Sequence, residues 1–460
     1  MNFRDQIKND FLQDYLTYVE GCSESPLIFH IWCALSGAGA AIGRNAWFQL
    51  GAFDIYPNQF VLLVGPSGVR KSSALSFIRK LLKEKTNVKF SPTDTAGQRQ
   101  GLLTAMLPKV NDGNEEDDFV DALLKQGDEF NFDMQFNQLS DDASAPDISS
   151  ILAGSVEEIN TMFVCASEFT SFIGNKSQEL VTCLIDLWDN LDYYSYQLKQ
   201  SHFMLKKPTI TMLGATTAEA LFASLPTNTI ETGFISRTLL VYGGQQYKSL
   251  PRPARPDPIL GEKLAIILGN LNKSFRGVFK ETDDAKAMLD YLYTYDAKLT
   301  DARFINYLGR RHTHLIKIVS ILAACENRHT IQIKDVETAH LILSETEKDM
   351  PHAIGEYGMN PISIAKQRII NYLMTRTDPE PINQSTLWSL LNRDIINRDF
   401  IAALAELVQT GKIVTISATA EDGRTKFTQY ALVSRMTAAD RLKYTPKNKK
   451  RPGDLGKYMN

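Results

Sequence analysis

The chain has 460 residues, of which 43% are hydrophobic and 22% are charged, and its formal net charge is −3. This length allows two or three domains with sizeable cores, and the small net charge excludes a protein that is basic throughout. Residues 1–10 lack the apolar stretch of a secretory signal, and the longest apolar segment, 28–42, is too short to span a bilayer. We therefore expect a cytoplasmic protein with no membrane partner.

The first 55 residues are predicted to form an N-terminal helical segment. Residues 8–20 and 26–43 both have the hydrophobic spacing of a helix. Ser25 is predicted to cap the second of these helices, with Pro26 at its first position.

Residues 56–250 have the pattern of an α/β domain. Continuous apolar runs of strand length, separated in most cases by helical segments, lie at 59–64, 161–166, 209–214 and 238–242. Such alternation predicts a mainly parallel sheet covered by helices on both faces. An acidic insertion interrupts the domain at residues 111–147, where twelve Asp or Glu residues stand against one Lys. We expect a solvated loop there, with the shielding of a basic channel as the alternative.

The remaining chain is predicted to hold three further parts. The proline-rich stretch "PRPARPDP" marks a boundary, and residues 251–358 are predicted to form a helical lid. Residues 359–435 read as three short helices followed by a hairpin that turns at Asp422-Gly423, which is the order of a winged helix. Residues 436–460 contain seven Lys or Arg against two Asp and are predicted to be a disordered basic tail.

The stretch "LLVGPSGVRKSS" comes close to a phosphate-binding loop of the pattern G-x-x-x-x-G-K-[ST]. It follows an apolar strand and opens a helix, which is the context that such a loop requires. Lys71 would reach the β- and γ-phosphates of ATP, and the hydroxyl of Ser72 would bind Mg²⁺. The predicted loop consists of Gly65, Pro66, Ser67, Gly68, Val69, Arg70, Lys71, Ser72 and Ser73.

Arg70 replaces the glycine that usually precedes the lysine. We expect an arginine at this helix start to adopt an ordinary negative φ. Its side chain would then point away from the phosphates or lie along them. An ordinary strand–turn–helix with a surface lysine is the alternative to a nucleotide site.

A second strand supplies the predicted acid. The run "TMFVCASEF" ends in Ser167 and Glu168, and Glu168 would act as the catalytic base that polarises the attacking water. Ser167 stands where an Asp is usual, so it could hold Mg²⁺ only through a water molecule. The alternative is a strand that simply ends in an exposed Glu.

Taken together, these motifs resemble the AAA+ ATPases, a class of P-loop NTPases. Their order is most similar to minichromosome-maintenance-type helicases and to a related family of phage and mobile-element ATPases, which also tends to carry an arginine before the lysine. The resemblance covers residues 57–348 and, more loosely, the winged helix. It implies a ring, with six subunits expected, that holds ATP between neighbouring subunits.

The resemblance also implies three further roles. Thr216 falls at the sensor position after a strand, with Thr217 as its rival. Arg237 would be the arginine finger that completes the neighbouring subunit's site, and an ordinary salt-bridged arginine is the alternative. A second sensor would be Arg310 or Arg311, at the start of a lid helix.

DNA contacts are predicted in two places. The hairpin "YYSYQLKQSHFMLKKP" lies where the helicases place a pore hairpin, and its Lys199, Lys206 and Lys207 alternate with aromatic residues. A surface hairpin whose aromatics pack on the core is the alternative. In the winged helix, Arg398 and Arg424 are the candidates, although a protein-docking role is equally compatible with this segment.

The leading hypothesis is an ATP-driven DNA translocase, a ring-forming replicative helicase of a phage or mobile element in a bacterial cytoplasm. Its cofactors would be ATP and Mg²⁺, and its partners single-stranded DNA in a central pore and other replication proteins. The second hypothesis is a non-translocating ATPase switch, such as a loader, an initiator or an anti-phage defence component. A third is a DNA-binding regulator with a degenerate nucleotide site.

Overall fold

The computed structural model describes residues 3–92, 98–107, 160–197, 202–226, 233–295, 299, 301–355, 361–377, 380–393, 395–419 and 426–436. The chain divides into two compact units, residues 1–355 and 356–460, and each is described by itself. The acidic segment 111–147 and residues 437–460 lie outside the described residues. No helix within the described ranges is long and apolar enough to cross a membrane.

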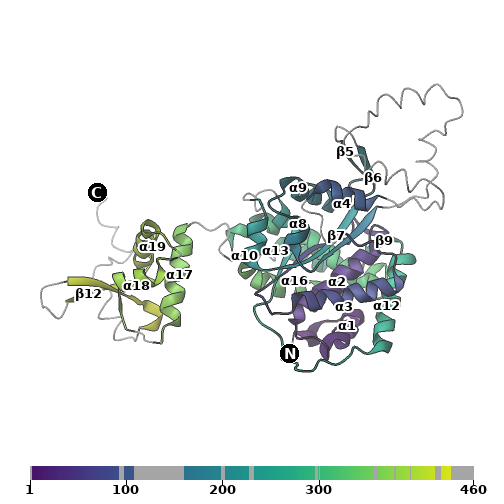
Figure 1. The fold of residues 1–460 in the computed structure, drawn as a ribbon. Helices are drawn as coiled ribbons and strands as arrows, with labels where there is room; N and C mark the ends of the chain where they lie inside the picture. The colour runs from purple at the N-terminus through teal and green to yellow at the C-terminus, as the bar shows by residue number, and fades with distance from the viewer. Residues whose placement is uncertain are drawn as a thin grey trace, which may run out of the picture. The chain divides into compact units, whose positions relative to one another are not determined.

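A four-stranded parallel sheet lies at the centre of the first unit (Figure 1). Its order is β4-β7-β3-β8, and nearly every residue of these strands is buried. The strands are β3 (Phe60–Val64), β4 (Thr161–Ala166), β7 (Thr209–Thr216) and β8 (Thr238–Tyr242). They coincide with the four apolar runs in the sequence, so the predicted parallel sheet of an α/β fold is confirmed.

Helices cover both faces of this sheet, as the sequence predicts. On one side α2 (Leu27–Ile42) contacts all four strands and packs against α3 (Lys71–Lys85), which follows β3 (Figure 1). On the other side α8 (Phe169–Ile173) and α9 (Gln178–Trp188) contact β7. The prediction that Ser25 caps α2 is wrong, because Pro26 occupies the N-cap and the Ser25 hydroxyl bonds elsewhere.

A second, mixed sheet has the order β10-β9-β1-β2. Its strands are β1 (Ala46–Leu50), β2 (Phe53–Ile55), β9 (Gly277–Glu281) and β10 (Thr330–Ile331). The expectation that residues 251–358 are all helical is therefore wrong for β9 and β10, and the expectation that residues 1–55 form a helical segment is wrong for β1 and β2. β9 buries only Phe279 fully and β10 has two residues, so neither carries the continuous apolar run by which the central strands are predicted.

The other helices of the first unit pack around these sheets. The long helices α15 (Arg311–Cys325) and α16 (Ile333–Ile354) contact each other, while α15 also contacts α2 and α16 contacts β8. The segment predicted as a lid is thus in extensive contact with the sheet domain. The elements are η1 (Arg4–Gln6), α1 (Asp10–Glu20), α4 (Arg99–Met106), α10 (Ala218–Ser224), α11 (Phe234–Arg237), α12 (Pro258–Lys273), α13 (Asp283–Tyr295), η2 (Ala302–Phe304), α14 (Ile305–Leu308), α15 (Arg311–Cys325) and α16 (Ile333–Ile354).

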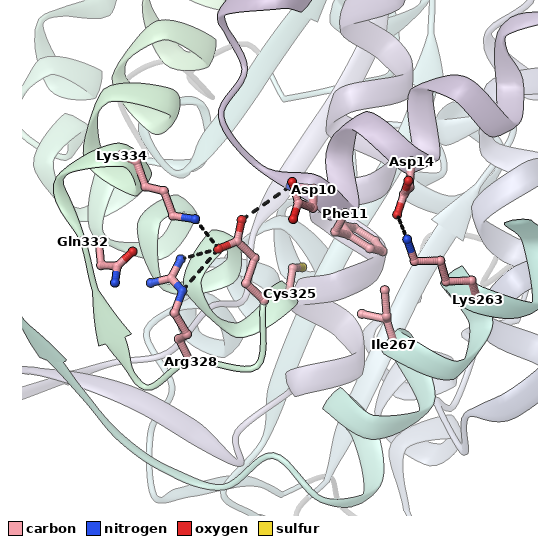
Figure 2. Close-up of a pocket in the computed structure, with 10 residues that line it drawn as sticks. Asp10, Phe11, Asp14, Lys263, Ile267, Cys325, Arg328, Gln332 and Lys334 are labelled. Carbon is pink, nitrogen blue, oxygen red and sulfur yellow. Dashed lines mark hydrogen bonds and ion pairs between the residues drawn. The ribbon is translucent and has the colours of Figure 1, made fainter.

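Ion pairs fix the N-terminal helix α1 to this unit around a cavity of about 430 Å³ (Figure 2). Glu326, at the end of α15, accepts hydrogen bonds from Lys334 at 2.6 Å and Arg328 at 2.8 Å, and its other oxygen faces the backbone N–H of Asp10 at 3.4 Å. Asp14 pairs with Lys263 of α12 at 2.6 Å. One ion pair and one backbone hydrogen bond therefore connect α1 to α12 and to the end of α15.

The second unit has three helices and a small antiparallel sheet. The helices are α17 (Pro361–Thr375), α18 (Gln384–Leu391) and α19 (Asn397–Gln409); the strands are β11 (Ile382–Asn383), β12 (Ile413–Thr419) and β13 (Lys426–Leu432), and η3 (Val433–Arg435) follows. Ile369, Leu387, Phe400 and Tyr430 belong to its own hydrophobic core. The predicted order of three helices and a hairpin is confirmed, although the turn at Asp422-Gly423 lies outside the described residues.

Candidate nucleotide-binding site

Three separate segments of the chain meet at the carboxyl edge of the central sheet. The strands are parallel, so their carboxyl ends point the same way, and ligands of open α/β sheets bind at this edge. Val64, the last residue of β3, pairs with Thr216 of β7, and Ala166 of β4 pairs with Gly214 of β7. The predicted loop, the predicted acid and the predicted sensor are thereby brought to one edge.

Gly65 and Gly68 are both required by the loop, for different reasons. A Cβ at Gly65 would lie 2.3 Å from the carbonyl oxygen of Gly243, which follows β8. Gly68 has φ +95°, a conformation that side chains disfavour. Val69 is buried and anchors the loop, whereas Pro66, Ser67 and Gly68 are exposed. An exposed loop before a helix N-terminus is suited to an anion, because its free N–H groups can point at the ligand.

Lys71, the first residue of α3, folds back over the loop. Its Nζ donates hydrogen bonds to the carbonyl oxygens of Gly65 at 2.6 Å and Pro66 at 2.9 Å. Partial burial lowers the pKa of Lys71, while the nearby carboxylates of Glu168 and Glu219 act to raise it. The negative charges of both carboxylates therefore act on the ammonium group.

Sequence reasoning missed Glu219, in the first turn of α10. A detectable signal was present, because an acid that follows the strand run at 209–216 must lie at the same sheet edge as Glu168.

Glu168 follows β4 and is exposed beside the loop. The hydroxyl of Ser72 lies 3.4 Å from the carbonyl oxygen of Ser167, so the start of α3 lies against the end of β4. Glu168 Oε1 accepts a hydrogen bond from the Thr170 hydroxyl at 3.3 Å. The arrangement leaves an accessible carboxylate next to a lysine and a hydroxyl, which is a suitable set for handling a phosphate ester and a water molecule.

Arg70 differs from its prediction. It has φ +61° and ψ +31°, in the left-handed region where glycine is the usual residue, and not an ordinary negative φ. A non-glycine residue there costs about 1–2 kcal/mol. The side chain is directed to Glu24, and its Nε donates a hydrogen bond to Glu24 Oε2 at 2.8 Å. The carbonyl oxygen of Arg70 accepts a hydrogen bond from the Ser25 hydroxyl at 2.7 Å.

Thr216 lies at the expected edge, but its hydroxyl is buried. It is 2% exposed, and its Oγ1 donates to the carbonyl oxygen of Thr217 at 3.2 Å. Thr217 caps α10, since its Oγ1 accepts a hydrogen bond from the Ala220 N–H. Both hydroxyls thus serve the local backbone in this structure.

Arg237 is buried and paired within its own chain. Its Nη2 and Nε contact the two carboxylate oxygens of Asp189, at 2.6 and 3.2 Å. This geometry matches the alternative of a salt-bridged arginine better than that of a finger presented at the surface. Asp189, directly after α9, was not singled out from the sequence.

The two candidate lid arginines have different surroundings. Arg311 is buried, and its Nε donates to Glu347 Oε1 at 2.7 Å. Arg310 is partly exposed. Burial and the positive charge of Arg237 lower the pKa of Arg310, while the carboxylate of Asp189 acts to raise it. Of the two, Arg310 is therefore the one whose charge responds to the Asp189–Arg237 pair.

The predicted hairpin is present as β5 (Tyr193–Gln197) and β6 (His202–Lys206), which pair antiparallel. Tyr194 is buried, and the guanidinium of Arg99 lies 3.6 Å from the centre of the Tyr196 ring. These two aromatics therefore pack on the protein. Lys206 is exposed and Lys207 follows the strand with φ +47°, whereas Lys199 lies outside the described residues.

In the second unit, the predicted DNA-contacting residues are only partly described. Arg398, at the start of α19, has a side chain that is 86% exposed, and its Nε faces Asp399 at 3.3 Å. Arg424 lies outside the described residues.

A scan against models of protein families found no match for this chain, and a search of the curated proteins found none either. The interpretation of the site therefore depends on its geometry and on the motifs themselves.

Proposed function

We propose that this protein is an ATPase whose site lies at the carboxyl edge of β3, β4 and β7. The observation that carries the proposal is the placement of Ser72 against Ser167, which brings Lys71 and Glu168 to one site from two distant segments. An ordinary strand–turn–helix would need neither the close approach at Gly65 nor an exposed acid beside the lysine.

The residues present fit ATP with Mg²⁺. The exposed loop 66–68 and the N-terminus of α3 offer backbone N–H groups to phosphates, and Lys71 offers a positive charge. Mg²⁺ takes oxygen ligands and keeps several waters, so the hydroxyl of Ser72 could bind it directly and Ser167 through a water. When bound, Mg²⁺ would neutralise charge on the phosphate oxygens.

In this proposal each side chain has a defined task. Lys71 exchanges its hydrogen bonds to loop carbonyls for bonds to phosphate oxygens. Glu168 orients a water molecule and accepts its proton as the water oxygen attacks the γ-phosphorus of ATP. The bond between that phosphorus and the bridging oxygen breaks, and ADP leaves with the bridging oxygen. Arg237 would act in a neighbouring subunit only after leaving Asp189.

For the finer identity, we propose an AAA+-type P-loop fold and ATP-driven movement along DNA, as in a ring-forming helicase of a phage or mobile element. Two features support it: the lysine-bearing β5–β6 hairpin, and the order of elements in the second unit, which is that of a winged helix.

ATP hydrolysis with and without DNA, together with strand displacement, tests the translocase proposal. Replacing Lys199, Lys206 and Lys207 with Ala should abolish DNA stimulation and unwinding while basal hydrolysis remains. The matched control replaces three exposed lysines elsewhere, Lys273, Lys280 and Lys286, and should keep both activities. A wild-type protein that hydrolyses ATP but is neither stimulated by DNA nor able to unwind it would contradict the translocase.

The non-translocating switch is the second candidate, and the Asp189–Arg237 ion pair favours it. An arginine finger that is paired within its own chain is compatible with a protein whose assembly state changes when ATP binds. For a switch, the triple lysine variant would have no effect, while ATP would shift the oligomeric state measured by light scattering.

A further inference from the structure

Two segments from outside the phosphate loop hold it through a connected set of hydrogen bonds. Glu24 and Ser25, in the turn between α1 and α2, bond the side chain and the carbonyl oxygen of Arg70. Gln246, after β8, donates from its Nε2 to the carbonyl oxygen of Gly68 at 3.0 Å.

Glu24 also ties these two segments to each other. Its Oε1 accepts a hydrogen bond from the backbone N–H of Leu250 at 2.8 Å, and its carbonyl oxygen accepts one from the N–H of Tyr247 at 3.0 Å. The Glu24 side chain is mostly buried, with 14% exposed, whereas that of Arg70 is 54% exposed. The Leu250 N–H and the Arg70 guanidinium both lower the pKa of Glu24, so the carboxylate stays charged.

We propose that Glu24 is a positioning residue for the nucleotide site, acting through Arg70. The ion pair and the Ser25 hydrogen bond hold Arg70 in a left-handed conformation that a residue with a Cβ disfavours, and so set the direction in which the chain enters α3. This inference rests on the proposed ATP-binding function. It assigns Arg70 the role of an anchor to a neighbouring acid and not of a phosphate ligand.

The comparison of Arg70→Ala with Arg70→Gly separates this role from the others. Both variants lose the bond to Glu24, but alanine keeps the Cβ that opposes φ +61°, whereas glycine adopts that conformation without cost. We expect R70A to bind Mg-ATP at least tenfold more weakly than wild type in isothermal titration calorimetry. R70G should bind it at least fivefold more tightly than R70A. If Arg70 contacted phosphate, both variants would bind Mg-ATP equally weakly. If Arg70 had no role, neither variant would bind Mg-ATP more weakly than wild type.

Glu24→Gln tests the acid itself. E24Q should weaken Mg-ATP binding five- to tenfold in the wild-type background and less than twofold in the R70G background, because glycine no longer needs the anchor. Glu262→Gln is the matched control, since Glu262 also lies in a surface ion pair, with Lys85 at 3.2 Å. Equal Mg-ATP affinities of R70A and R70G, or an equal effect of E24Q in both backgrounds, would overturn the inference.

Amide hydrogen exchange without nucleotide keeps this test independent of the proposed function. Peptides that span residues 65–72 should exchange at least threefold faster in E24Q than in E262Q, with peptides from α15 unchanged. Exchange in E24Q at the E262Q rate would overturn the positioning role. A wild-type protein that binds no Mg-ATP but shows this exchange difference would instead reject the proposed function and retain the anchor.

Discussion

Lys317 is a buried lysine on α15 whose titration should make stability depend on pH. Its Nζ donates to the carbonyl oxygen of Tyr56 at 2.9 Å and to Asn58 Oδ1 at 2.5 Å, and it lies 4.3 Å from the Trp188 ring centre. Burial lowers the pKa of Lys317 from 10.5 to about 7. The folded protein therefore releases this proton at a lower pH than the unfolded chain does.

Between pH 7 and 10.5 the unfolded chain binds the proton of Lys317 and the folded protein does not. The free energy of unfolding should therefore gain up to about 1.4 kcal/mol per pH unit from this residue as the pH rises through this window. The melting temperatures of wild type and of Lys317→Met at pH 7, 8 and 9 measure this contribution. From one pH to the next, the melting temperature of wild type should rise relative to that of K317M. The control Lys286→Met, at an exposed site, should have the same pH dependence as wild type. Equal pH dependence of wild type and K317M would contradict the assignment.

At the residue scale, the sequence predicts well which side chains lie at the site, but it does not predict which residues these side chains contact. Lys71, Ser72 and Glu168 are found at one sheet edge because strand direction alone determines where they lie. The partners of Arg70 and Arg237 are Glu24 and Asp189, 46 and 48 positions away in the chain. No local pattern joins such pairs, so the backbone angle of Arg70 and the engagement of Arg237 could not be read from the sequence.

At the scale of elements, the loop after β3 and the segment after β8 approach so closely that only glycine fits between them. A Cβ at Gly65 would meet the backbone oxygen of Gly243 at 2.3 Å, and a backbone atom cannot rotate away as a side chain can. Gly65→Ala should therefore lower stability by about 1–3 kcal/mol, as overpacking does, and weaken Mg-ATP binding.

Denaturant unfolding and calorimetry of G65A measure these two effects. Gly309→Ala is the control, because a Cβ there would meet nothing closer than 3.6 Å and the residue has φ −63°. A G65A protein as stable as G309A would contradict the packing argument.

The sequence predicts some strands and hairpins better than others. The four central strands are buried along their whole length, so each produces a continuous apolar run. The strands β9 and β10 are short and half-exposed. β9 pairs with β1 and β10 pairs with β9, and these partners are far apart in the sequence, so the local pattern predicts only a helical segment there. The β5–β6 hairpin was predicted from its position, but the anchoring of Tyr196 by Arg99 was not.

At the scale of the whole molecule, the chain consists of two compact units, each with its own core. The proposed ATPase site lies wholly in the first unit. The helices α2 and α16 pack on its sheet, and the turn between α1 and α2 contacts the phosphate loop through Glu24 and Ser25.

The most direct test of this account is steady-state ATP hydrolysis by the full chain with Mg²⁺, compared among wild type, Lys71→Ala, Glu168→Gln and the control Glu262→Gln. We predict hydrolysis by wild type and E262Q, and loss of Mg-ATP binding in K71A. E168Q should bind Mg-ATP but hydrolyse it about 10²–10⁴-fold more slowly, because it retains the loop and loses the base. Hydrolysis by E168Q at the wild-type rate, or a wild-type protein that neither binds nor hydrolyses Mg-ATP, would contradict the account.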